Sequence, residues 1–266
     1  TTLLAGSAQE QSRGLVEDSR WSLLNRSVLD HREYQHGARN NAARNAYKPR
    51  NERSGNAQEW GYGLMGSLQS GFTQDLVGVG VDAHAYAAWQ LDSGGGRAGK
   101  ARLLGLDNDG HPKDQFGRGG AALKLRASST TLSYGEQRVK TPVFSSSDSR
   151  LLPETATGFY LNSQEFAGFK ILGGHFNEST DRNASSHDQG FVVNYSNARQ
   201  GNNFDLAGLV FDGIEGLSTS LYSARYEDSW RQHYLGSTYS HALGLDQTLS
   251  LNLNLYRTLD TGQAWS

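Results

Sequence analysis

A strict alternation of apolar and other residues over positions 77–91 is the feature that most constrains the fold of this chain. Every odd position there is apolar: Val77, Val79, Val81, Ala83, Ala85, Ala87, Trp89 and Leu91. The even positions are Gly78, Gly80, Asp82, His84, Tyr86, Ala88 and Gln90. Side chains of a strand point alternately to its two faces, so this pattern predicts one strand with an apolar face and a wetter face.

Other segments repeat this period of two. Even positions over 60–72 are mostly apolar, and apolar residues over 121–127 alternate with Lys124 and Arg126. Near the end, the leucines over 249–255 alternate with serine and asparagine. Such segments are typical of strands that have one apolar and one polar face.

The predicted connections alternate in length along the chain. Short connections are expected near 73–75, 128–130, 164–168, 212–216 and 243–246. Long polar stretches are expected near 30–58, 92–117, 138–157 and 177–203, whereas 228–231 is short. About eleven strands result. Hairpins that are tight at one end and long at the other are typical of an outer-membrane barrel, with turns in the periplasm and loops outside the cell.

We therefore predict an all-β fold, an antiparallel up-and-down transmembrane β-barrel. A strand that crosses hydrocarbon needs a long apolar face, and only a closed barrel pairs every strand backbone group there. Water in the lumen then permits charged side chains on the inner face. A soluble β-sandwich or solenoid is the alternative, but its strands average roughly 5 to 6 residues.

Composition excludes several other classes of protein. Only 36% of the 266 residues are hydrophobic, yet 10% are aromatic and the formal charge is only −2, which does not fit a disordered chain. The mean hydropathy is −0.62, and no apolar run reaches the length of a transmembrane helix, about 18 residues. The small net charge predicts no nucleic-acid partner. The chain has no cysteine, which excludes disulfides, thiolate metal sites and a cysteine nucleophile.

Two domain segments are expected. Residues 1–13 are either the remnant of a signal peptide or a disordered N-terminus, since small residues precede a possible cleavage site before Gln9. Residues 14–266 form the barrel domain.

Five stretches, taken together and in order, resemble the OprD (Occ) family of outer-membrane channels. They are "GLVEDSRWSLLNRSVLDHRE", "SGFTQDLVGVGVDA", "TPVFSSSDSRLLPETATGF", "EDSWRQHYLGSTY" and "LNLYRTLDTG". The resemblance implies a monomeric barrel of about 18 strands in the Gram-negative outer membrane. It also implies uptake of small carboxylate-bearing nutrients, such as amino acids and aromatic or other organic acids.

The same resemblance implies that the chain is a fragment. It corresponds to roughly the N-terminal two thirds of the family's length, about 11 of its strands, and is truncated at the C-terminal end. An open sheet of this kind exposes two edges, so we do not expect it to insert alone as a stable pore. The resemblance also places residues 191–196, which alternate like a strand, in a long loop after the seventh strand.

The resemblance further implies a row of basic side chains along one lumen wall and a constriction made by the third loop. Arg26 and Arg32 match arginine positions in that row, and Ser149 with Arg150 matches a pair at the constriction. A passing carboxylate would then receive a bidentate arginine contact and a hydroxyl donor.

Alternation and local context add four further pore-lining candidates. Lys124 and Arg126 fall on the wet face, where they either line the pore or pair with Asp82 on the neighbouring strand. Arg231 lies beside a short loop. Three alternatives are open for its side chain: it faces the vestibule, it contacts lipopolysaccharide at the rim, or it is solvated.

The function expected from the sequence is a substrate-specific diffusion channel for small anionic solutes. A general non-selective porin and a soluble β-rich binding module or adhesin are the alternatives. We expect no enzymatic activity, no cofactor and no metal, because no Ser–His geometry and no metal-ligand spacing can be argued from the sequence. The expected partners are anionic solutes, outer-membrane lipid and lipopolysaccharide.

Overall fold

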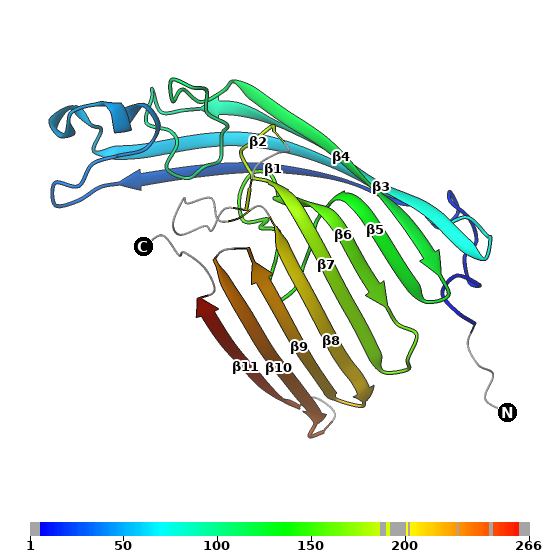
Figure 1. Cartoon of the computed structure of the whole chain (residues 1–266). Coiled ribbons are helices and arrows are strands. Elements are labelled where there is room, and N and C mark those ends of the chain that lie inside the picture. The colour runs from blue at the N-terminus through cyan, green and yellow to red at the C-terminus, as the bar shows by residue number, and fades with distance from the viewer. Residues whose placement is uncertain are drawn as a thin grey trace.

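The computed structural model describes residues 6–186, 190–191, 201, 203–227, 229–244 and 247–260. In this part of the chain, 11 antiparallel strands form one sheet, in which each strand pairs with the next in sequence order. The sheet curls around a central loop region (Figure 1). The predicted all-β up-and-down architecture and its strand number are confirmed. Strands β1 and β11 are the two edges of this sheet.

The strands range from 8 to 16 residues. Their bounds are β1 Arg20–Glu33, β2 Asn56–Gln69, β3 Val77–Asp92, β4 Gln115–Ala127, β5 Thr130–Gln137, β6 Thr155–Ser163, β7 Phe169–Thr180, β8 Phe204–Ile214, β9 Leu217–Tyr226, β10 Trp230–Ala242 and β11 Thr248–Asp260. Two short 3-10 helices, Ala43–Tyr47 and Arg50–Glu52, lie in the first long connection. No helix among the described residues is long and apolar enough to cross a membrane.

The predicted asymmetry of the connections is confirmed. Turns of 2 to 7 residues separate the strands at one end of the sheet, for example 128–129 and 70–76. Four long loops lie at the other end, which we call the loop end: 34–55, 93–114, 138–154 and 181–203. For β1 to β4, Figure 1 shows the long loops and the turns on opposite sides of the molecule.

The two faces of the sheet differ as the alternation predicted. Val79 of β3 lies opposite Leu125 of β4, and both side chains are exposed on the outer face. Their neighbours at even positions point inward, where Tyr86 and Ala88 are buried. The leucines of β11 continue this apolar outer surface with about half of their area exposed. A broad exposed apolar band of this kind is what contact with lipid requires.

The inner face of the sheet packs against loops rather than remaining empty. One apolar cluster joins β2, β3 and β4 to the second and third long loops and includes Leu103, Leu104, Leu151 and Leu152. A second cluster joins Val139 and Val143 of the third loop to Phe176, Phe204 and Tyr234 on β7, β8 and β10. The third loop, residues 138–154, is therefore fixed to the inner face at both of its ends.

Two glycines on β2 make room for this loop. A Cβ on Gly61 would lie 2.7 Å from Leu151 Cδ2, and one on Gly63 would lie 3.1 Å from the Leu151 carbonyl oxygen. Both glycines point inward, on the face that also carries Met65. The inner face of β2 therefore depends on small residues where the third loop approaches it most closely.

The short turns lie at the end of the sheet opposite the loop end, which we call the turn end. Residues 6–13, the described part of the predicted N-terminal segment, pack against these turns. The backbone N–H of Gln9 donates to the Ser128 carbonyl at 2.8 Å, and its side-chain amide donates to the Thr73 and Asp75 carbonyls. Ser12 is buried and donates to the Phe72 carbonyl. Residues 1–5 lie outside the described residues, as do residues 192–196 of the predicted inserted loop.

We expect Gly63→Val to loosen the third loop, because the added side chain collides with Leu151 backbone. Overpacking of this kind costs about 1–3 kcal/mol. Trypsin should then cut faster after Lys140 or Arg150 in the folded barrel. Gly66→Val is the matched control on the outer face of the same strand, where a Cβ would meet the Ala85 carbonyl at an ordinary 3.8 Å. Equal cleavage rates in both variants would contradict this packing.

Candidate pore and constriction

Arg26 of β1 reaches across the inner face to hold the third loop. Its Nη1 donates to Asp148 Oδ1 at 2.9 Å and to the carbonyls of Asp148 and Arg150. The side chain faces inward because Arg26 lies opposite Gly63, and a glycine there leaves the guanidinium a clear path. Arg26 therefore fixes the third loop against the inner face of the sheet.

Arg118 of β4 is a second anchor, which the sequence reasoning missed. It is only 7% exposed. Its guanidinium donates to the carbonyls of Pro153, Asp181 and Ala184, and so ties the third loop to the fourth. Alternation with Lys124 and Arg126 could have indicated its inward direction. The carbonyls that it binds belong to loops, whose course no strand pattern encodes.

Asp148 lies between two arginines within the third loop. Oδ1 accepts from Arg26, and Oδ2 accepts from Arg138 at 2.8 Å. Burial raises the pKa of Asp148, but the Arg26 hydrogen bond and the charges of both arginines outweigh it and hold the pKa below its ordinary value. The carboxylate therefore stays ionised at neutral pH, and its charge is balanced locally.

A polar cavity of about 560 Å³ lies among residues of the four long loops. It is lined by Asn41, Ala42, Gly99, Lys100, Ala101, Arg102, Ser147, Ser149, Arg150 and Arg182. The cavity thus gathers four cationic side chains, and no carboxylate is among these lining residues. Such a concentration of positive charge suits an anionic solute.

The four cations of the cavity are not equivalent. Arg102 pairs with Asp181, and Arg182 pairs with Glu154 at 2.5 Å. Lys100 donates to the Asn41 side chain, and Arg150 donates to the carbonyls of Ala101 and Ser149. Within the described part of the chain, Lys100 and Arg150 have no acidic partner at ion-pair distance.

Glu59 of β2 shapes the wall that carries Lys100. This carboxylate is 1% exposed. Its Oε1 accepts from the backbone N–H groups of Gly99 and Ala101 at 2.8 and 2.7 Å. Its Oε2 accepts from those of Leu103 and Leu104 at 2.9 and 3.3 Å. One buried side chain therefore fixes the turn of the second loop on which Lys100 stands, and sequence reasoning did not identify it.

Ser149 and Arg150, which the resemblance assigns to the constriction, line the same cavity. Ser149 is exposed, and its hydroxyl is 3.2 Å from that of Ser147. Arg32 is placed elsewhere, because its guanidinium forms a two-pronged pair with Asp30 at 2.8 and 2.9 Å on the same strand. Of the two arginines predicted on this strand, only Arg26 contacts the third loop.

The predicted residues near the turn end form a separate group. Lys124 Nζ is 2.5 Å from Asp82 Oδ1 and also donates to the Ser70 carbonyl. Of the alternatives left open, the pairing with Asp82 therefore holds for Lys124. Arg126 instead donates to Gln9, and its guanidinium lies 3.9 Å from the centre of the Phe72 ring. Both cations line a cavity of about 320 Å³ that also includes Arg13 and Arg20.

Arg231 differs from the expectation that it lines the pore. It alternates along β10 with Gln232 and Tyr234, and Tyr234 is buried in the inner apolar cluster. Its cross-strand neighbours are Arg225 on β9 and Leu259 on β11. Both faces of this strand mix polar and aromatic residues, so composition alone does not reveal its inward face. Arg231 points outward from the sheet.

Comparisons with known proteins agree with this architecture. The family model described as "outer membrane porin, OprD family" matches residues 13–266. The chain belongs to the OprD family of outer-membrane porins. Porin D of Pseudomonas aeruginosa is 37% identical over 258 residues, which are 97% of this chain and 54% of that protein.

Solved OprD-family structures share the fold. The crystal structure of Pseudomonas aeruginosa OccK9 (OpdG) gives a TM-score of 0.82 at 30% identity and covers 95% of this chain and 61% of that one. The structure of Pseudomonas aeruginosa OpdK with vanillate gives a TM-score of 0.77 at 29% identity and covers 94% of this chain and 60% of that one. This chain spans little more than half the length of these OprD-family relatives. As a member of this family, it is a Gram-negative outer-membrane protein.

We expect Arg26→Ala to raise single-channel conductance of the complete barrel that contains this chain. The substitution removes three hydrogen bonds from a charged guanidinium that hold the third loop, each worth about 1.5–3 kcal/mol, and conductance should rise by roughly half or more. Arg32→Ala is the matched control on the same strand and face, where the partner is Asp30. Planar-bilayer recordings measure both. An unchanged conductance in Arg26→Ala, or an equal rise in Arg32→Ala, would contradict the expectation that Arg26 holds the third loop in the passage.

Proposed function

We propose that this chain forms the substrate-selecting wall of a diffusion channel for small carboxylate-bearing solutes. The observation that carries this proposal is the pair Lys100 and Arg150, whose charges have no acidic partner among the described residues and face one cavity. The cavity adjoins the narrowing made by Arg26 and the third loop. A solute carboxylate supplies the negative charge that these two groups lack.

Binding in such a cavity replaces the water that a carboxylate loses on entering a narrow passage. Arg150 offers N–H donors in a planar fork that matches a carboxylate, and Ser149 adds a hydroxyl beside it. A unit charge pair about 4 Å apart is worth roughly 4 kcal/mol at the effective dielectric constant of a protein surface. This attraction is strong enough to favour entry and weak enough to allow release.

Beyond the narrowing, the proposed route passes two further cavities, in which some charged side chains have ion-pair partners and others do not. A compartment of about 260 Å³ follows, whose lining includes Asp82, Glu136 and Arg138. Lys124 pairs with Asp82, so this carboxylate repels a passing anion less. The turn-end cavity then offers Arg20 and Arg126, although Glu17 and Asp18 also line it. Successive weak cationic sites let a solute move by exchange from one site to the next.

One comparison supports this class of solute, and another supports transport without chemistry. The OpdK structure was solved with vanillate, a small aromatic carboxylate. Porin D is a porin rather than an enzyme, so we propose that transport involves no chemical change of the solute. Which carboxylate this chain prefers depends on contacts of the solute's remaining atoms with the same cavity.

The test compares uptake of benzoate with that of benzamide, its neutral analogue of nearly equal size. Liposomes carry the complete barrel as wild type, Lys100→Gln or Arg150→Gln. Wild type should admit benzoate faster, and each substitution should lower the benzoate-to-benzamide ratio about three- to tenfold through loss of one charge-assisted contact.

Arg50→Gln serves as the control, because Arg50 is exposed in the first loop and does not line the cavity. Its ratio should match that of wild type. Equal entry of both solutes in wild type would instead indicate a general, non-selective porin. A wild-type preference that survives both cavity substitutions would place the selectivity elsewhere in the barrel.

A further inference from the structure

A groove of about 600 Å³ crosses five strands of the sheet, from β7 to β11. Residues that are cross-strand partners on successive strands form a row across the sheet, and the lining residues of the groove fall in three neighbouring rows of this kind. The middle row, Leu172, Gly208, Tyr222, Tyr234 and Tyr256, contains residues whose side chains point inward. The rows on either side point outward. The hollow is therefore on the outer face, and backbone of the middle row forms its floor.

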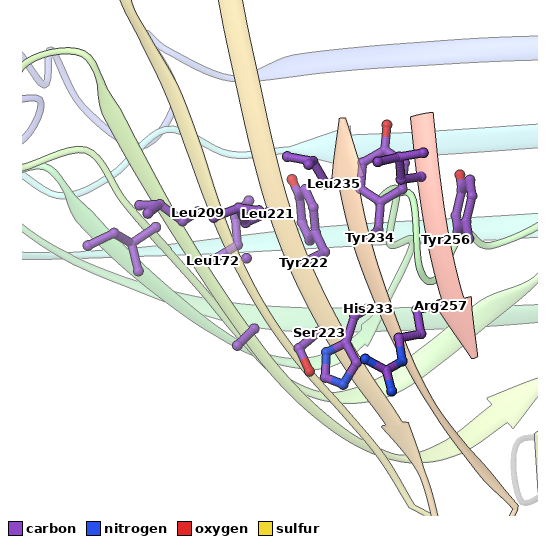
Figure 2. Close-up of a pocket in the computed structure, with 14 residues that line it drawn as sticks. Leu172, Leu209, Leu221, Tyr222, Ser223, His233, Tyr234, Leu235, Tyr256 and Arg257 are labelled. Carbon is purple, nitrogen blue, oxygen red and sulfur yellow. The ribbon is translucent and has the colours of Figure 1, made fainter. Parts of the chain in front are cut away.

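The two outward rows differ in chemistry. The row nearer the turn end is apolar throughout: Ile171, Leu209, Leu221, Leu235 and Leu255. The row nearer the loop end is small or polar: Gly173, Ala207, Ser223, His233 and Arg257. Figure 2 shows Ser223, His233 and Arg257 grouped on one side of the tyrosines. Small residues deepen the groove, and its charged end lies toward the loops.

Two further arginines stand immediately beyond the polar row. Arg225 of β9 and Arg231 of β10 are direct cross-strand neighbours on the outer face. Like charges placed directly opposite each other destabilise a sheet unless an anion lies between them. Asp205 is opposite Arg225, but its carboxylate hydrogen-bonds His175 at 2.7 Å. Among the described residues, none of Arg225, Arg231 and Arg257 has an acidic partner at ion-pair distance.

We propose that this outer groove binds lipid A, the phosphorylated and multiply acylated glycolipid of the outer leaflet. The loop end of an outer-membrane barrel lies at the outer leaflet. The arginine fork matches phosphate oxygens, and the leucine row offers an apolar wall below for acyl chains. The change from leucine to arginine between adjacent rows marks the boundary between hydrocarbon and head groups. The inference rests on outer-membrane location and is independent of the solute that the channel carries.

Native mass spectrometry of the complete barrel in detergent tests this site with lipid A added. Wild type should retain diphosphoryl lipid A at least about tenfold more tightly than lipid A stripped of both phosphates. The triple variant Arg225→Gln/Arg231→Gln/Arg257→Gln should lose that difference, whereas the triple Arg→Lys variant should keep only part of it, because lysine retains the charge without the two-pronged donor. The wild-type comparison needs no substitution and so remains decisive if the glutamine variant fails to fold.

The first loop provides the matched control, because it carries Arg39, Arg50 and Arg53 outside the groove. Arg39→Gln/Arg50→Gln/Arg53→Gln should bind diphosphoryl lipid A as wild type does. Loss of binding in this variant would place the phosphate site on the loop and overturn the proposal. Equal retention of dephosphorylated lipid A, or of phosphatidylglycerol, would also overturn it, since a purely apolar or non-selective anionic surface would then suffice.

Discussion

The attachment of the third loop to the inner face of the sheet is the interaction on which the functional features depend. Leu151 packs against β2 where Gly61 and Gly63 leave space, while Val139 packs against the opposite wall. Buried loop carbonyls need donors, and the guanidinium groups of Arg26 and Arg118 supply them. Apolar contact therefore brings the loop inward, and arginine hydrogen bonds fix its course across the lumen.

Once the loop is fixed, charge is distributed unevenly along the passage. Two carboxylates on the inner side of the sheet are matched by cations, since Lys124 pairs with Asp82 and Arg26 pairs with Asp148. Among the described residues, Lys100 and Arg150 have no acidic partner at ion-pair distance, and both line one cavity. Lys100 is exposed and Arg150 is half-buried, so both cations remain open to an anion that arrives and leaves. On the outer face, Arg225 and Arg231 likewise have no acidic partner at ion-pair distance among the described residues. We propose that a lipid phosphate supplies the balancing negative charge.

The period of two in the sequence was enough to predict the strands, the two faces and the unequal ends. It also placed Asp82, Lys124 and Arg126 inward, because their neighbours on β3 and β4 are clearly apolar. Arg231 could not be placed in this way, since β10 has aromatic and polar residues on both faces. Glu59, Arg118 and Lys100 were missed because their roles depend on loop backbone, and alternation within strands carries no information about where a loop folds.

The most direct test of the account is whether the third loop lies in the conducting path. This chain contains no cysteine, so Ser149→Cys introduces a single reactive thiol into it. A bulky thiol-specific reagent, applied during bilayer recording of the complete barrel, should reduce the current in one step per channel. Full modification, verified by mass, with an unchanged current would contradict a lumenal third loop and the selectivity site built on it.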